Sequence, residues 1–73
     1  MKKYIVDVFF IGYGVFCGHI LNDTADYLTT MTTIAKSEKH AENNVRYRFF
    51  EEWGDNGHPH SQFVFQVRKG ADA

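Results

Sequence analysis

The sequence predicts an α+β fold, in which a small antiparallel sheet of three to four strands carries one helix on one face, in the order β-β-β-α-β. Three observations lead to this prediction. Residues 3–11 are rich in β-branched and aromatic side chains, which favour a strand. Apolar residues recur every four positions over 41–53, as on one side of a helix. Residues 61–69 alternate between apolar and polar side chains, as in a half-buried strand.

The first predicted strand, 3–11, has two faces of different character. Alternation places one uncharged set toward the core, namely Tyr4, Val6, Val8 and Phe10. The other face carries Ile5, Asp7, Phe9 and Ile11. This second set contains a charge, yet it is too apolar to lie comfortably in water.

Two more strands are expected before the helix. Gly12-Tyr13-Gly14 is typical of a hairpin turn or a bulge, because glycine adopts positive φ readily. Residues 15–21 then form the second strand, and Asn22-Asp23-Thr24 is expected to form a turn. Four threonines over 27–35 favour a third strand over a helix.

The helix is expected to begin after Ser37, a good N-cap, with Glu38 in the first turn where the helix dipole favours an anion. One apolar stripe follows, formed by Ala41, Val45, Phe49 and Trp53 and widened by Phe50. Glu42 and Arg46 form a favourable i, i+4 pair, and Gly54 ends the helix. Residues 55–60 are expected to form a loop. In the strand that follows, Phe63, Phe65 and Val67 are expected to point inward.

Composition predicts one folded domain over 1–73, with frayed ends at 1–2 and 70–73. The chain has 73 residues, 44% of them hydrophobic and 16% aromatic, which is too short for a dinucleotide-binding fold or a (β/α)₈ barrel. Eight basic against nine acidic side chains give a net charge of −1. This balance argues against direct nucleic-acid binding, although Arg46, Arg48, Arg68 and Lys69 beside Tyr47 or Phe9 keep that alternative open.

The location expected is the cytoplasm. The single cysteine, Cys17, allows no intramolecular disulfide and suits a reducing compartment. Asp7 interrupts the apolar N-terminal run, which is unlike a signal peptide, and the glycines that follow interrupt any membrane span.

Histidine and cysteine occur in two pairs at i, i+2 spacing: Cys17 with His19, and His58 with His60. Two such pairs would make a Cys-His₃ set suited to zinc. The alternative is an exposed polar loop at the two later histidines, with Cys17 as a small buried hydrophobe. No base is placed to activate Cys17 as a nucleophile, and Glu51 and Glu52 point about 100° apart on the helix. We therefore expect no enzymatic activity.

The second face of the first strand is the leading candidate for binding. One helix covers one face of a small sheet, so Ile5, Phe9 and Ile11 require a loop, another copy or a partner to cover them. Tyr13, Arg46 and Tyr47 are expected to act as aromatic and arginine anchors beside them.

Part of the chain resembles a pattern found in small bacteriophage proteins. The residues concerned are Ile34-Ala35-Lys36-Ser37, Ala41 in the helix, Gly54 at its end and the Phe-Val-Phe-Gln-Val strand at 63–67. Anti-CRISPR proteins and a phage inhibitor of host RNA polymerase have a similar hairpin, helix and strand. The resemblance covers about half the chain, from Ile34 to Lys69. It implies a tiny cytoplasmic protein that occupies a surface of a host complex. No contact residue of those families maps onto this sequence.

The sequence therefore predicts a non-enzymatic binding protein, phage-encoded, that sterically inhibits a larger protein or protein–nucleic acid complex. Two other classes stay open. One is a zinc module built from Cys17, His19, His58 and His60. The other is a structural homodimer in which the apolar sheet face is a subunit contact.

Overall fold

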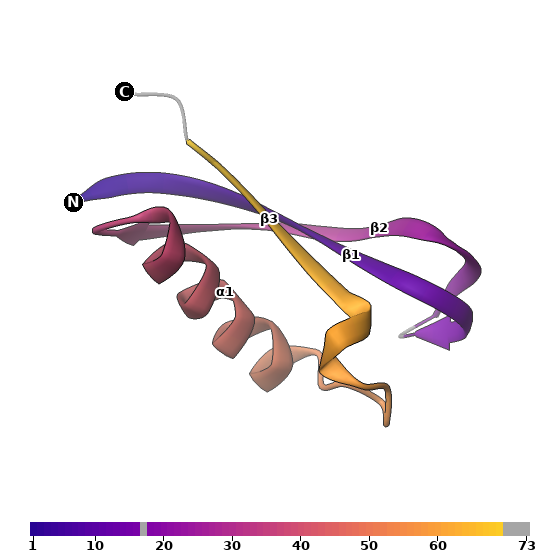
Figure 1. Cartoon of the computed structure of the whole chain (residues 1–73). Coiled ribbons are helices and arrows are strands. Elements are labelled where there is room, and N and C mark those ends of the chain that lie inside the picture. Colours follow the sequence, from indigo (N-terminus) through magenta and orange to yellow (C-terminus); the bar gives the residue numbers. More distant parts are fainter. Residues whose placement is uncertain (17, 70–73) are drawn as a thin grey trace.

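The computed structural model describes residues 1–16 and 18–69, without the side chains of His19, Asn22 and Asp23. The chain forms two long strands, a helix, one turn of 3₁₀-helix and a short last strand (Figure 1). The elements are β1 (Lys2–Phe16), β2 (His19–Ala35), α1 (Glu38–Glu52), η1 (His60–Gln62) and β3 (Phe63–Lys69). The predicted fraying of 70–73 lies outside the described residues, and Lys2 pairs with Ala35 at the start of the sheet.

The sheet is antiparallel in the order β2-β1-β3, with α1 and η1 on one side of it (Figure 1). The predicted α+β class, with one antiparallel sheet and one helix, is confirmed. Two long strands, β1 and β2, precede the helix, and β3 follows it. The predicted second strand, 15–21, is divided between the end of β1 (15–16) and the start of β2 (19–21), and the predicted third strand, 27–35, is the end of β2. The two long strands form one hairpin, which an irregularity divides into a proximal ladder, 2–11 with 25–35, and a distal ladder, 13–16 with 19–22.

The predicted turns at 12–14 and 22–24 lie opposite each other at this irregularity, and neither reverses the chain. Ile11 pairs with Ala25 and Tyr13 pairs with Asn22, so Gly12 alone faces two residues of β2. The extra residue of this irregularity therefore belongs to β2, at 23–24, and Gly12 is the single residue of β1 opposite it. The reversal itself lies farther along, where Phe16 pairs with His19.

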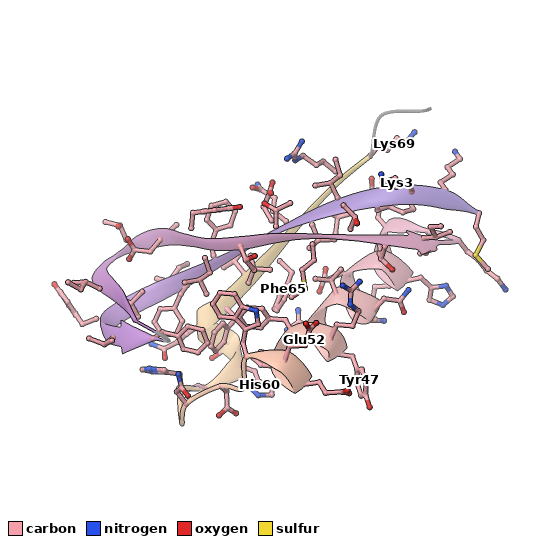
Figure 2. All side chains as sticks on the ribbon, turned by 180° about the vertical axis from the view of Figure 1, so that it is seen from behind. Lys3, Tyr47, Glu52, His60, Phe65 and Lys69 are labelled. Atoms are coloured by element: carbon pink, nitrogen blue, oxygen red, sulfur yellow. The ribbon has the colours of Figure 1, made fainter. Side chains whose placement is uncertain are left out.

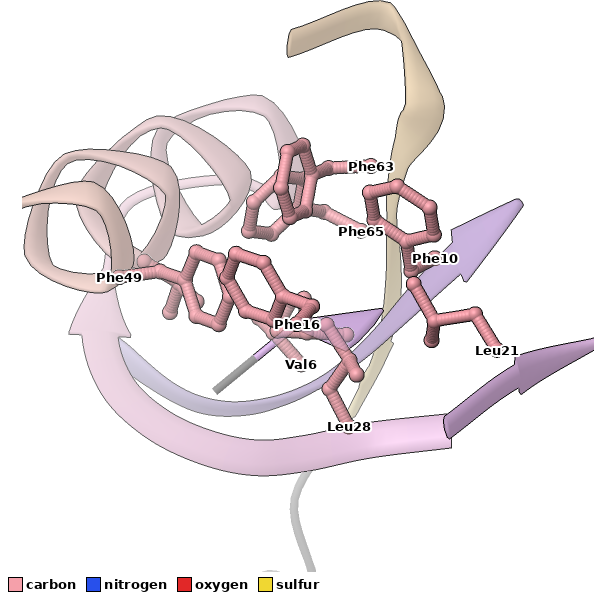
Figure 3. Packing of buried hydrophobic residues seen from close by; sticks show 10 residues of the cluster. Val6, Phe10, Phe16, Leu21, Leu28, Phe49, Phe63 and Phe65 are labelled. Atoms are coloured by element: carbon pink, nitrogen blue, oxygen red, sulfur yellow. The ribbon is translucent and has the colours of Figure 1, made fainter. Parts of the chain in front are cut away.

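The core lies between the inner face of the sheet and α1 (Figure 3). All four residues predicted for the inner face of the first strand are buried. The distal ladder extends this face, so that Phe16 stacks on Phe49 of α1 at 6.0 Å and meets Phe63 of β3 edge-on at 5.2 Å. The buried members of the main cluster are Val6, Val8, Phe10, Phe16, Leu21, Leu28, Val45, Phe49, Phe63 and Phe65.

Helix α1 has the boundaries that its sequence predicts. Ser37 is the N-cap, and its Oγ accepts a hydrogen bond from the His40 amide at 3.3 Å. In the predicted stripe Ala41, Val45 and Phe49 are completely buried, whereas Phe50 and the C-cap residue Trp53 are half-buried against the core. Gly54 follows the C-cap at φ +73°, the left-handed conformation that commonly ends a helix.

Strand β2 forms one edge of the sheet and β3 the other. Residues 27–35 of β2 contain neither a charge nor a proline. Helix α1 contacts this strand through Arg48, whose guanidinium donates a hydrogen bond of 2.9 Å to the Thr32 carbonyl. The side-chain amide of Asn44 lies 3.5 Å from Thr33 Oγ1.

Candidate binding surfaces

The outer face of the sheet is the face opposite α1, and no other element covers it in the described part of the chain (Figure 1). Its residues follow from alternation along β1 and from the cross-strand pairing. They are Lys3, Ile5, Asp7, Phe9, Ile11, Tyr13 and Val15 of β1, Ile20, Ala25, Tyr27, Thr30, Thr32 and Ile34 of β2, and Val64, Gln66 and Arg68 of β3.

The proximal half of this face carries a network of polar side chains beside Ile5 and the exposed Ile34. Asp7 accepts hydrogen bonds from Arg68 Nε at 3.0 Å and from Thr30 Oγ1 at 2.7 Å, and the Tyr27 hydroxyl lies 2.6 Å from the same threonine oxygen. The hydrogen bond from Arg68, followed by the one from Thr30, lowers the pKa of the Asp7 carboxyl. These contacts stabilise the charge of the Asp7 carboxylate on the sheet surface.

The distal half of the outer face is apolar, and we call it the outer patch. It consists of Phe9, Ile11, Tyr13, Val15, Ile20, Tyr27 and Val64. Tyr13 is 73% exposed and Ile20 is 76% exposed, although both are large apolar side chains. Phe9 and Tyr27 pack edge-on at 5.8 Å and give the patch a fixed aromatic centre.

The outer patch is large for a chain of this size. A fully exposed aromatic side chain presents roughly 200 Å², so the exposed fractions of the patch correspond to an apolar area on the order of 600 Å². The largest apolar patch on a typical monomer measures about 300–600 Å² and is often functional. The patch therefore lies at the upper limit for a surface that faces water permanently.

The structure divides the six predicted binding residues between two surfaces. Ile5 and Phe9 are half-buried on the outer face, and Ile11 and Tyr13 are exposed there. Arg46 and Tyr47 lie on α1, on the other side of the sheet. The single surface that combines all six residues is therefore wrong, because the helix packs on the face opposite to the patch.

A second surface, the α1–η1 groove, lies between the exposed side of the helix and the 3₁₀ turn. It has a volume of about 530 Å³ and is lined by Asn43, Arg46, Tyr47, Phe50, Glu51 and His60. The rings of Phe50 and His60 stack at 3.9 Å with an angle of 8° between their planes. Tyr47 and His60 extend from this side of the molecule, away from the sheet (Figure 2).

Sequence reasoning identified Arg46 and Tyr47 but missed Phe50 and His60 as parts of one groove. Spacing along the helix relates Tyr47 to Phe50. No local pattern relates either of them to His60, because His60 reaches Phe50 only when the loop after α1 folds back toward the helix. That return depends on the turn at Asp55, whose Oδ1 accepts a hydrogen bond of 2.9 Å from the Gly57 amide.

The two loop histidines are engaged in different contacts. The His58 ring packs edge-on against Phe10 at 4.8 Å, whereas His60 stacks on Phe50 and its Nε2 lies 3.0 Å from Asp55 Oδ2. The Gly57 amide, followed by His60, lowers the pKa of the Asp55 carboxyl. Asp55 therefore fixes both the turn and the His60 ring.

The proposed Cys-His₃ zinc set falls only partly within the described structure. Cys17 lies outside the described residues, and the side chain of His19 is not among those described. Among the residues that the structure does describe, no group of three or more His, Cys, Asp or Glu side chains is arranged to hold a metal ion. The zinc site stays a prediction from the sequence.

Comparison with protein-family models, with curated proteins and with solved structures found no match. None of the helices in the described part of the chain has the length and apolar character needed to cross a bilayer.

Proposed function

We propose that this protein is a non-enzymatic protein-binding module that docks on its partner through the outer patch. The observation that carries the proposal is the set of large apolar side chains on a sheet face that no other described element covers. Tyr13 and Tyr27 supply rigid aromatic anchors, and aliphatic residues of all three strands surround them.

The position of the patch on a sheet supports specific docking. All the β1 residues of the patch are paired with residues of β2. Phe9 is also paired with Val64 of β3. Side chains on paired strands lose little further freedom on binding, which favours affinity. The Asp7 network closes one end of the patch with polar groups, as is typical of the rim of an interface.

A narrower proposal rests on the sequence resemblance alone: the partner is a host assembly, such as a CRISPR or transcription complex, that the protein inhibits by steric occlusion. This proposal assigns no catalytic residue. It also names the first purified partners to try, an RNA polymerase and a CRISPR effector complex.

Two equally exposed tyrosines on opposite sides of the molecule give a matched test. Tyr13 lies in the outer patch and is 73% exposed, whereas Tyr47 lies on α1 and is 72% exposed. We expect Tyr13→Glu to weaken binding to the partner by at least about tenfold, because it places a charge in an apolar interface. Tyr47→Glu should leave that affinity unchanged. Affinity capture from source cells, followed by titration of the purified partner, provides the measurement.

Three outcomes contradict the proposal. The first is an affinity that Tyr13→Glu leaves intact, and the second is the failure of the wild-type chain to retain any partner. The third is a dimer of the chain alone, seen by light scattering and dissociated by Tyr13→Glu, since this would make the patch a subunit contact.

A further inference from the structure

The α1–η1 groove lies on the opposite side of the sheet from the outer patch, and the proposed function does not use it. Its walls come from α1 and from the loop residue His60, which the Asp55 contact holds in place. The stacked Phe50 and His60 rings and the exposed Tyr47 side chain all line the groove. The groove therefore combines a fixed shape with aromatic surfaces.

The charges around the groove leave one carboxylate uncompensated. Arg46 is bound to Glu42 at 2.7 Å, and its guanidinium lies 4.6 Å from the centre of the Phe65 ring, so its charge is already paired. The His60 ring is paired with the Asp55 carboxylate. Within residues 1–16 and 18–69, Glu51 has no such partner.

The end of the helix adds to this negative charge. The last turn of α1 contains Glu51 and Glu52 and no basic residue. The carbonyl groups at a helix C-terminus carry a partial negative charge, which makes carboxylates there unfavourable and a cation favourable. Glu52 lies 3.9 Å from Arg48, whereas Glu51 lines the groove and forms no ion pair with any other described residue.

We propose that the α1–η1 groove binds an arginine side chain carried by a segment of another protein. The guanidinium would stack on the Tyr47 ring and form hydrogen bonds to the Glu51 carboxylate, which lies one helical turn away on the same side of α1. Arginine fits this arrangement better than lysine, because its planar group can stack on a ring and bond a carboxylate through two N–H groups at once. The volume of about 530 Å³ leaves room for residues beside the arginine.

The test is an NMR titration of the ¹⁵N-labelled full chain with three capped peptides, Ac-Gly-Xaa-Gly-NH₂, in which Xaa is arginine, lysine or citrulline. Citrulline keeps the shape of arginine without its charge. We expect the arginine peptide to shift the amide signals of residues 43–51 and 60, with a dissociation constant on the order of millimolar. The citrulline peptide should shift none of them.

Two variants and one matched control locate the contact. Glu51→Gln and Tyr47→Leu should each weaken binding of the arginine peptide by about three- to fivefold, since each removes one exposed charge or cation–π contact. Glu52→Gln is the control, because it removes the neighbouring carboxylate, which pairs with Arg48. It should leave the affinity unchanged.

The proposal is wrong if the arginine peptide shifts no groove signal, if the citrulline peptide binds equally well, or if Glu51→Gln binds like the wild type. Equal affinity for the lysine peptide would overturn the choice of arginine. The outcome is independent of the Tyr13→Glu experiment, because the two surfaces lie on opposite sides of the sheet.

Discussion

Residues of α1 differ greatly in how much they contribute to stability, according to the side of the helix on which they lie. Phe49 is completely buried and contacts phenylalanines of β1 and β3, whereas Tyr47, two positions earlier, is 72% exposed. The core of a 73-residue chain is thin, so each buried ring accounts for a large share of it.

The first prediction concerns this contrast. We expect Phe49→Ala to lower the free energy of unfolding by about 3–5 kcal/mol, because a cavity replaces the ring, and Tyr47→Ala to lower it by less than about 1 kcal/mol. Urea denaturation followed by circular dichroism measures both. Phe49→Leu, with an expected loss of about 1–2 kcal/mol, keeps the comparison measurable if the alanine variant does not fold. Equal losses at positions 47 and 49 would contradict the packing described here.

Asp7 provides the second prediction, which concerns pH. Hydrogen bonds from Arg68 and Thr30 lower the pKa of its carboxyl in the folded state below that in the unfolded chain. The carboxylate therefore stabilises the fold above the unfolded pKa of about 4, and this contribution is lost as the pH falls through the folded pKa. We expect Asp7→Asn to be about 1 kcal/mol less stable at pH 7 and to lose less stability than the wild type between pH 5 and pH 2.

Urea titrations of both proteins at a series of pH values measure this difference. Parallel curves for Asp7→Asn and wild type over the acidic range would show that the Arg68 contact does not contribute to stability.

Among the elements, α1 is the one that the sequence predicts best. Its N-cap, its apolar stripe and the glycine after its end are all local features, and Ser37, Ala41 and Gly54 have the expected roles. The long hairpin was harder to predict, because a glycine at positive φ is compatible with both a bulge and a turn. The choice between them depends on pairing with distant residues of β2, which a local pattern does not contain.

The two candidate surfaces also differ in how far the sequence alone predicts them. The outer face followed from alternation along one strand, and Ile11 and Tyr13 lie exposed on it. The α1–η1 groove needs His60 to return to Phe50, a contact set by the fold of the loop. Arg46 and Tyr47 were identified individually, but the helix carries them to the other side of the sheet.

Gly12, which lies opposite the extra residue of β2, gives the third prediction. Gly12 has φ +154°, and a Cβ atom there would lie 2.8 Å from Cε1 of the buried Phe10 ring and 2.9 Å from Gln62 Nε2. Gly14, at φ +113°, has open space around the same position. We expect Gly12→Ala to lower the free energy of unfolding by about 1–3 kcal/mol more than Gly14→Ala does. Both variants strain the backbone at a positive φ, but only the alanine at position 12 also clashes with neighbouring side chains. Denaturant titration of the two variants measures the difference, and equal losses would contradict the described packing.

At the scale of the whole molecule, the sheet separates two surfaces of different chemistry. The outer patch is apolar, and the α1–η1 groove combines aromatic rings with an unpaired carboxylate. The central strand β1 supports both surfaces, since it contributes directly to the patch and its inner face packs on the helix. One chain could therefore contact two partners at the same time.

The fourth prediction concerns local stability. Residues 4–10 of β1 are paired with β2 on one side and β3 on the other, whereas residues 13–16 are paired with β2 alone. We expect the slowest amide hydrogen exchange within 4–10 and exchange at least about tenfold faster within 13–16, because residues 13–16 have a paired strand on one side only. Exchange followed by NMR at single residues measures both segments. Equal protection would show that the hairpin opens only as one unit.

The open edge of β2 has a consequence for how the protein behaves at high concentration. Natural sheets discourage self-association at their edges with lysine, proline or bulges. Of these features, residues 27–35 contain a bulge, at Leu28. The Arg48 side chain also covers part of this edge, through its hydrogen bond to the Thr32 carbonyl. Another chain could add a strand to this edge and in turn present the same edge to a third. Arg48 would then act as a gatekeeper against fibril growth, and its loss would shorten the lag before amyloid appears.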